Sequence, residues 1–426
     1  MAQMTLPVQV APEGGYFVDG TGKPLLFHGW CAGPLLVAVD FAEASRFLDD
    51  RAAEGITALA VDLVSASGAG WRASRSGGYP FDGGIARPRD EYFEPAISFV
   101  RAARERGMTV FMQALPLGSR VRLDPRRTDD SLGCLSALLD AGESGASAYG
   151  RFLAERFGAA DNIIWVLGGS DTTPDAVPLL RVIADQLAAA IPGAIIAAQG
   201  RPDDRFFEMF ENETWPALHA LTSYEVPHQV IREERARRPD LPAVLLDSTY
   251  ENEWGATPDM IRRQSYWAIT GGACGQFAGS TLITPGSAPA DAEARSSMAT
   301  RDHSRALSFL EKLPWWKLRA ANYTDDLVAG GVGQHWGVNT CTAATTAERD
   351  LAVVYVPTSR PIDIDFSKLA MGQYIVRTFQ PGSGDVGPAR TFRAAGAWTI
   401  EPPGDSDWAL VIAKDDLLSS IAEERG

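Results

Sequence analysis

The segment from Asn162 to Pro174, NIIWVLGGSDTTP, places a carboxylate directly after a very apolar run. Residues 163–167 are all large and apolar, which is typical of a strand buried on both faces in a parallel sheet. Gly168 and Gly169 allow the backbone to turn sharply or to approach another group closely. Asp171 is therefore expected at the carboxyl end of a strand. An Asx turn or the N-cap of the following helix is the alternative explanation for this aspartate.

The same kind of apolar segment recurs along the first three quarters of the chain. Eight candidate strands occupy residues 24–30, 56–64, 108–117, 162–171, 193–200, 220–226, 242–251 and 273–280. Helical patterns lie between them at residues 41–55, 93–107, 147–160, 176–193 and 257–272. Eight alternating strands and helices predict an α/β fold of the (β/α)8, or TIM-barrel, type, in which reactive groups gather at the carboxyl ends of the strands.

The pattern changes near Leu313 to short alternating strands separated by turns. These candidate strands occupy residues 351–357, 361–366, 373–380, 389–395, 397–403 and 408–414. No long helical pattern interrupts them, so we expect a small C-terminal β-sandwich. The predicted division is an N-terminal extension with a first β hairpin at 1–20, the barrel at 21–313 and the β-sandwich at 314–426.

Charge and composition narrow the function. The formal net charge of −15 would repel nucleic acid and anionic membrane surfaces, so a neutral substrate fits better. No apolar stretch is long enough to span a bilayer, and the first residues lack the pattern of a signal peptide. We expect a cytoplasmic protein, or a periplasmic or secreted one if an export signal has been removed. The sequence does not indicate an oligomeric state.

The sequence predicts neither a metal site nor a cofactor. Its four cysteines lie far apart without a CxxC pair: Cys31, Cys134, Cys274 and Cys341. The histidines have no companions at the spacing of metal ligands. After the first strand, FHGWCAG stands where a nucleotide-binding protein would have a glycine-rich phosphate loop.

Polar and aromatic side chains gather where the predicted strands end. Asp171 follows the fourth strand and Asp247 ends the seventh, so the two carboxyl groups are expected to face each other across the mouth of the barrel. Glycoside hydrolysis needs such a pair, with one carboxyl group protonated as the acid and the other ionised as nucleophile or base. We interpret Asp171 and Asp247 as the catalytic residues.

Other residues near the strand ends are candidates for binding substrate hydroxyls or sugar faces. They are His28, Trp30, Asp62, Gln113, Tyr224, Glu225, His228, Tyr250, Glu251 and Gln276. The alternative for each is a structural role, since a buried histidine or glutamine more often satisfies backbone groups and an aromatic residue more often packs in the core. Trp71, Tyr79 and Trp254 are further aromatic candidates.

Six segments together resemble the apiosidase-like glycoside hydrolases. They are GYFVDGTGKPLLFHGW, FLDDRAAEGITALAVDLV, YGRFLAERFGAADNIIWVLGGSD, TYENEW, IRRQSYWAITGGACGQFAGS and LPWWKL. The resemblance covers the whole barrel, and the C-terminal part is similar to the small β domain of these proteins, which carries a collagen-binding label. It implies a retaining mechanism, with the aspartate after strand four as acid/base and a carboxylate on strand seven as nucleophile.

The sequence departs from the family pattern at both carboxylates. Ser170 interrupts the usual Gly-Gly-Asp, and Asp247 stands where the family has a glutamate, which is longer by one methylene. Asp247 remains our candidate nucleophile, with Glu251 as the alternative. We expect a retaining glycosidase that acts on a neutral glycoside, with apiose or another pentofuranose as one candidate. The alternative is a non-catalytic carbohydrate-binding relative on the same fold.

Overall fold

The computed structural model describes residues 4–67, 70–75, 78–118, 133–202, 206–224, 227–281, 297–321, 327–335 and 337–414. Eight parallel strands close into a barrel, in the order β4-β5-β8-β9-β10-β11-β12-β13 and back to β4. Their bounds are β4 Phe27–Cys31, β5 Ala58–Asp62, β8 Thr109–Pro116, β9 Ile163–Gly168, β10 Ile195–Gln199, β11 Leu218–Thr222, β12 Ala243–Asp247 and β13 Gly275–Ala278. The predicted (β/α)8 barrel is confirmed.

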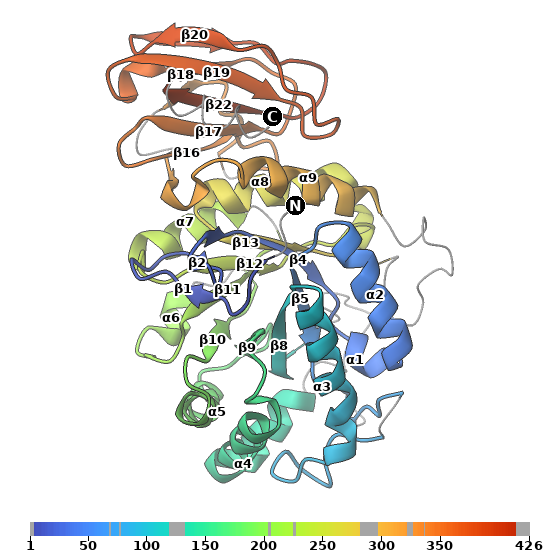
Figure 1. Cartoon of the computed structure of the whole chain (residues 1–426). Coiled ribbons are helices and arrows are strands. Elements are labelled where there is room, and N and C mark those ends of the chain that lie inside the picture. The colour runs from blue at the N-terminus through green and yellow to red at the C-terminus, as the bar shows by residue number, and fades with distance from the viewer. Residues whose placement is uncertain are drawn as a thin grey trace.

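Helices surround this barrel (Figure 1). Their bounds are α1 Leu35–Ala38, α2 Phe41–Ala53, α3 Asp90–Glu105, α4 Gly133–Phe157, α5 Val177–Ala190, α6 Phe206–Phe210, α7 Pro227–Arg237, α8 Pro258–Gly271 and α9 Met298–Leu310. In the part of the chain that the structure describes, none of them combines the length and the apolarity needed to cross a membrane.

Aromatic rings show which side chains fill the barrel interior. The Phe27 ring lies 5.1 Å from that of Phe111, which lies 4.7 Å from that of Phe277. A Cβ on Gly29 would lie 2.4 Å from the Phe277 ring, so glycine is needed for this ring to fit. Because side chains alternate along a strand, every second residue from these rings faces the interior and the others face the helices.

Short antiparallel strands supplement the barrel. A three-stranded sheet consists of β1 Gln9–Val10, β2 Phe17–Val18 and β3 Pro24–Leu25, and β6 Ala66–Ser67 pairs with β7 Gly70–Trp71. The Phe17 ring packs 5.3 Å from that of Phe27, the first residue of β4. This sheet therefore lies at the amino end of the barrel, away from the carboxyl ends of the strands.

The C-terminal region contains two antiparallel sheets. The larger sheet has the order β14-β16-β17-β22-β19-β20, and the smaller has the order β15-β18-β21. Their bounds are β14 Arg319–Ala320, β15 Val328–Gly330, β16 Thr342–Thr345, β17 Leu351–Val356, β18 Ile362–Asp365, β19 Gln373–Phe379, β20 Arg390–Arg393, β21 Ala397–Ile400 and β22 Trp408–Lys414. The sequence pattern missed β14, β15 and β16, because they are short and contain mostly small residues rather than large apolar ones.

Helices α8 and α9 lie between the barrel and the β domain (Figure 1). Two aromatic pairs cross this interface with nearly parallel rings. Tyr266 of α8 stacks on Tyr355 of β17 at 4.4 Å, and Phe309 of α9 stacks on Phe379 of β19 at 4.0 Å. All but Phe309 are buried, so the two domains share apolar surface as a core does.

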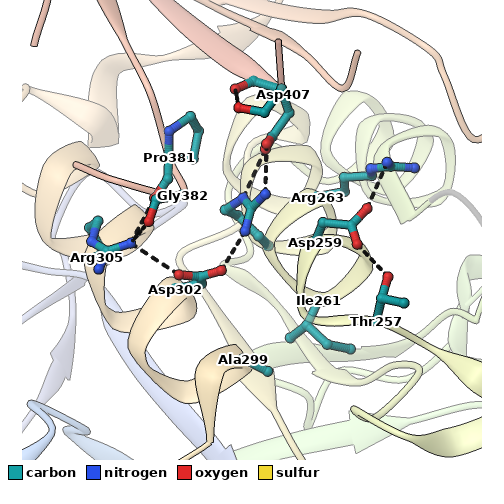
Figure 2. Close-up of polar contacts among 12 residues, drawn as sticks. Thr257, Asp259, Ile261, Arg263, Ala299, Asp302, Arg305, Pro381, Gly382 and Asp407 are labelled. Atoms are coloured by element: carbon teal, nitrogen blue, oxygen red, sulfur yellow. Dashed lines mark hydrogen bonds and ion pairs between the residues drawn. The ribbon is translucent and has the colours of Figure 1, made fainter. Parts of the chain in front are cut away.

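A buried ionic network crosses the same interface (Figure 2). Both Asp407 oxygens accept hydrogen bonds from the Arg262 guanidinium, at 2.9 and 2.6 Å, and the Tyr355 hydroxyl donates to the same carboxylate at 2.8 Å. Arg262 also binds Asp302, and Arg305 donates to the carbonyl oxygens of residues 381 and 382 in the β domain. A buried charge depends on all of its partners, so this network holds the domains in one arrangement.

We predict that Asp407→Ala destabilises the whole protein. The substitution leaves Arg262 buried with one carboxylate fewer, and breaking a buried ion pair costs about 3–5 kcal/mol. Chemical unfolding should show the loss in one transition. Asp405→Ala, which removes an exposed carboxylate from the same loop, is the control and should leave the unfolding free energy nearly unchanged.

We also predict that a chain ending before Asn322 is insoluble or unfolded. Its barrel would expose Tyr266 and the Arg262 guanidinium, both of which the β domain covers. Expression and circular dichroism of the truncated chain test this expectation. A soluble, folded barrel would show that the interface is dispensable.

Candidate active site

The geometry of the turn after β9 explains why this apolar strand is followed by two glycines. Gly168 and Gly169 have φ values of 107° and 148°, in the region that favours glycine. A Cβ on Gly168 would lie 2.1 Å from the Gln199 carbonyl oxygen, and one on Gly169 would lie 2.5 Å from that of Leu117. The turn therefore sits tightly between the ends of β8 and β10, where no side chain fits.

This turn fixes Asp171 at the carboxyl ends of the strands. Its backbone N–H donates to the Leu117 carbonyl at 2.7 Å, and its side chain is buried. Gly118 lies directly against the carboxyl group, since a Cβ on that glycine would lie 2.7 Å from Cγ and Oδ2 of Asp171. Helix α5 begins at Val177 with Ala176 at the N-cap, so the helix-cap explanation for Asp171 is wrong.

A β-bulge places Asp247. Leu221 of β11 pairs with Leu245, but Thr222 pairs with Asp247, so Leu246 is the extra residue on β12. Val244 and Leu246 belong to the buried cluster that fills the barrel, and strict alternation would turn residue 247 toward the helices. The bulge resets the alternation.

Two phenols hold the Asp247 carboxyl group. The Tyr224 hydroxyl donates to Oδ2 at 2.7 Å, and the Tyr250 hydroxyl donates to Oδ1 at 3.1 Å. Thr249 supports this arrangement by donating to the Tyr224 carbonyl at 3.1 Å. Both Asp247 oxygens are acceptors, as in a carboxylate, and their direction is fixed from two sides.

A chain of interior side chains forms a polar layer across the strand ends. The Gln113 amide donates to the Gly168 carbonyl and to the Gln199 side-chain oxygen, both at 2.9 Å. Gln199 in turn donates to the Thr222 hydroxyl at 3.0 Å. Asp62 lies beside Gln113 in the register of β5 and β8. The sequence had pointed to Asp62 and Gln113, but it assigned no role to Gln199 or Thr222.

Asp62 has the clearest electrostatic perturbation among these residues. Burial raises the pKa of its carboxyl group from 3.8 to about 7, and the charge of Asp247 adds to this rise. Two carboxyl groups at the same barrel end, one inclined to keep its proton and the other held by hydroxyl donors, are a common feature of acid–base sites.

Three predicted substrate-binding residues lie elsewhere. His28, Trp30 and Gln276 alternate with interior positions of β4 and β13 and therefore face the helices. Nε2 of His28 lies 3.7 Å from Glu311, Trp30 is buried against the Arg51 guanidinium, and Gln276 accepts from Ser265 of α8. The structure does not bring these three side chains to the polar layer, so the proposed contact with substrate is not retained for them.

Other predicted residues have different outcomes. His228 is buried near Thr270 of α8, where burial lowers its pKa to about 3. Glu251 Oε1 accepts the backbone N–H of Ala299 at 3.2 Å, so it caps the first turn of α9 and serves the framework. Glu225 lies outside the described residues.

Trp254 marks the rim of the site. Its side chain is 59% exposed, and its ring meets that of Tyr224 edge-on at 6.0 Å. Its φ of 51° and the φ of 66° at Asn252 are unusual for residues other than glycine. Such strain is common at binding sites, and here it presents a large aromatic ring to solvent next to the residue that holds Asp247.

No group of three or more histidine, cysteine, aspartate or glutamate side chains in the described ranges is arranged to hold a metal ion. The described site presents carboxyl groups with phenols and amides as neighbours and hydrogen-bond partners.

Comparison with known proteins identifies the folding unit that carries this site. The family model described as "Apiosidase-like, catalytic domain" matches residues 11–318, and the model described as "Putative collagen-binding domain of a collagenase" matches residues 330–413. The comparison with curated proteins gives no match.

Solved structures share the architecture. One described as a glycoside hydrolase has 17% identity, covers 96% of this chain and 97% of its own, and gives a TM-score of 0.80. A glycoside hydrolase family 5 protein from Bacteroides vulgatus has 17% identity, with 96% and 94% covered and a TM-score of 0.79. An endo-1,4-beta-mannanase from Rhizomucor miehei is less similar, at 11% identity, with 71% of this chain and 99% of its own covered and a TM-score of 0.51. The barrel, its carboxyl-end site and the match over residues 11–318 together show that this chain belongs to the apiosidase-like family of glycoside hydrolases.

Proposed function

We propose that the protein is a retaining glycosidase in which Asp247 is the nucleophile. The observation that carries this proposal is the pair of hydroxyl donors, Tyr224 and Tyr250, that fix both oxygens of a carboxylate at the open end of the barrel. A nucleophile must approach the anomeric carbon from a defined direction, and a carboxylate held from two sides is already oriented for that attack.

Asp171 is the acid/base in this proposal. In the first step Asp247 forms a bond to the anomeric carbon while the bond to the leaving oxygen breaks, and the Asp171 proton passes to that oxygen. In the second step Asp171 takes a proton from water, the water oxygen binds the anomeric carbon, and Asp247 leaves with its electron pair. The tight turn at Gly168 and Gly169 supports this role, because it fixes Asp171 at the end of β9, three strands away from Asp247 on β12 in the barrel order.

The proposed substrate is a neutral glycoside, with apiose or another pentofuranose as one candidate. The net charge of −15 and the carboxyl groups of Asp62, Asp171 and Asp247 disfavour an anionic sugar. The polar layer offers amide and hydroxyl groups that can bind sugar hydroxyls, and Trp254 offers an aromatic face. A screen with aryl glycosides and with plant and bacterial oligosaccharides would identify the sugar. Binding of sugars without any turnover would instead support the non-catalytic alternative.

We predict that Asp171→Ala and Asp247→Ala differ in their dependence on the leaving group. Asp171→Ala should slow the first step for substrates with poor leaving groups by about 10²-fold or more, and should spare activated aryl glycosides, which do not need a donated proton. Asp247→Ala should reduce turnover of both kinds to background, since the glycosyl intermediate cannot form. Pre-steady-state kinetics with the two substrate types distinguishes these outcomes.

Glu251→Gln is the matched control for Asp247. Because Glu251 caps α9, this variant should lower stability modestly and keep most of the turnover. The assignment is refuted if Glu251→Gln is inactive while Asp247→Asn keeps nearly normal rates.

Trp254→Ala should raise KM with little change in kcat. Loss of an aromatic contact of about 1 kcal/mol with a sugar face weakens binding by roughly fivefold to tenfold. Trp398→Ala is the control, since that residue is similarly exposed, at 50%, but lies on β21 of the β domain. Equal KM values for the wild type and Trp254→Ala would remove Trp254 from the binding surface.

A further inference from the structure

Asp62 lies on the interior face of the barrel at the end of β5. Val61 belongs to the cluster between the strands and the helices, so the next residue points inward. Its carboxyl group faces Gly33, where a Cβ would lie 3.3 Å from Oδ2. In the described part of the chain its oxygens have no hydrogen-bond partner, although Asp62 is half-buried. A carboxyl group in this position has capacity to bind a group that the described residues do not supply.

Asp62 and Asp247 are the last residues of β5 and β12, so both stand at the carboxyl end of the barrel, where the charge of Asp247 acts on Asp62. Strands β4 and β13 separate them in the barrel order, and the last interior residue of β4 is Cys31, which has a small side chain. Cys31 of β4 pairs with Ala60 on one side, and its thiol donates to the Leu246 carbonyl at 3.0 Å on the other. One short side chain therefore connects the segments that end in Asp62 and Asp247, and no bulky residue on β4 stands between them.

We propose that Asp62 is a third functional carboxyl group of the site, which holds a proton opposite the Asp247 carboxylate and donates a hydrogen bond to a hydroxyl of the sugar that Asp247 attacks. The sugar contact rests on the proposed function. The proton sharing between Asp62 and Asp247 does not, because it depends only on the two side chains.

The groups around Asp62 leave it no source of positive charge among the described residues. The titratable groups that interact with it electrostatically are Asp247 of β12, Tyr92 of α3 and Cys134 of α4. Burial raises the pKa of Tyr92 and that of Cys134 well above neutrality, so both are uncharged at pH 7. Burial and the Asp247 charge together raise the pKa of Asp62 to about 7, so Asp62 keeps its proton below neutral pH.

The sign of the effect on stability follows from this shift. The unfolded carboxyl group titrates near pH 4, and the folded one titrates near 7, so folding takes up a proton between these values. The stability supplied by a neutral Asp62 is complete below pH 4 and is lost as the pH rises to about 7. Asp62→Asn cannot ionise, so its melting temperature relative to the wild type should rise across this window.

Titration of the enzyme without substrate tests the proton sharing. Carbon-13 NMR of protein labelled at aspartate carboxyl carbons should show one resonance that titrates near pH 7, is absent in Asp62→Asn and titrates at lower pH in Asp247→Asn. Asp175→Asn, which removes an exposed carboxylate that follows β9, controls for the change in net charge and should leave that resonance in place. The proposal is overturned if no aspartate titrates above about pH 5.5, or if Asp247→Asn has no effect on the neutral resonance.

The pH profile of kcat/KM tests the sugar contact, using the substrate found in the glycoside screen. With an activated aryl leaving group, the wild type should lose activity by about tenfold per pH unit above the Asp62 pKa. Asp62→Asn keeps an N–H donor and should show no loss in that range, whereas Asp62→Ala should be slow at every pH. A profile of Asp62→Asn identical to that of the wild type would refute the contact. If no glycoside is turned over, the proposed function fails while the titration result still decides the proton sharing.

Discussion

The extra residue on β12 is the constraint on which the site depends. Without the bulge at Leu246, alternation would turn the Asp247 side chain toward the helices. It would then lose the hydrogen bond from Tyr224 and its electrostatic interaction with Asp62. A bulge also removes a backbone carbonyl from the regular ladder, and the Cys31 thiol takes up that of Leu246. The cysteine in FHGWCAG thus compensates for an irregularity more than two hundred positions away in the chain. Cys31 pairs with Ala60 of β5 and bonds the bulge residue Leu246 of β12. It therefore contacts both strands that end in the carboxyl groups of Asp62 and Asp247.

The framework behind the site is held by polar contacts as much as by the core. Glu251 lies four residues after Asp247 and caps α9, which also carries Asp302 of the network around Arg262. The same network reaches Asp407 and Tyr355 in the β domain. A continuous series of bonded groups therefore runs from the end of β12 to the second domain. This arrangement explains why the β domain is expected to matter for a barrel whose reactive groups it does not supply.

The architecture could be predicted from the sequence because each barrel strand is a short run of apolar residues bounded by residues that favour turns. It also predicted that Asp62, Gln113, Asp171 and Asp247 stand at strand ends. Counting alternation from Phe27 would have shown that His28 and Trp30 face the helices, and counting from Phe111 would have drawn attention to Gln113 as an interior residue.

Other features had no local signal. The bulge at Leu246 depends on the register between two strands, which a single sequence does not display. The capping role of Glu251 depends on a helix that begins more than forty residues later. The strained backbone of Trp254 is likewise a property of the folded loop, because tryptophan has no intrinsic preference for positive φ.

The buried Arg262 limits which domains can be joined to this barrel by recombination. Recombination that joined this barrel to an unrelated accessory domain would deliver a buried guanidinium without Asp407, and a Tyr266 ring without Tyr355 to cover it. The free energy of unfolding of such a recombinant protein is expected to be too low for folding, even if its active-site residues are unchanged. The two domains are thus expected to be inherited together. New substrate specificity is expected to arise by substitutions at the rim of the barrel rather than by exchange of whole domains.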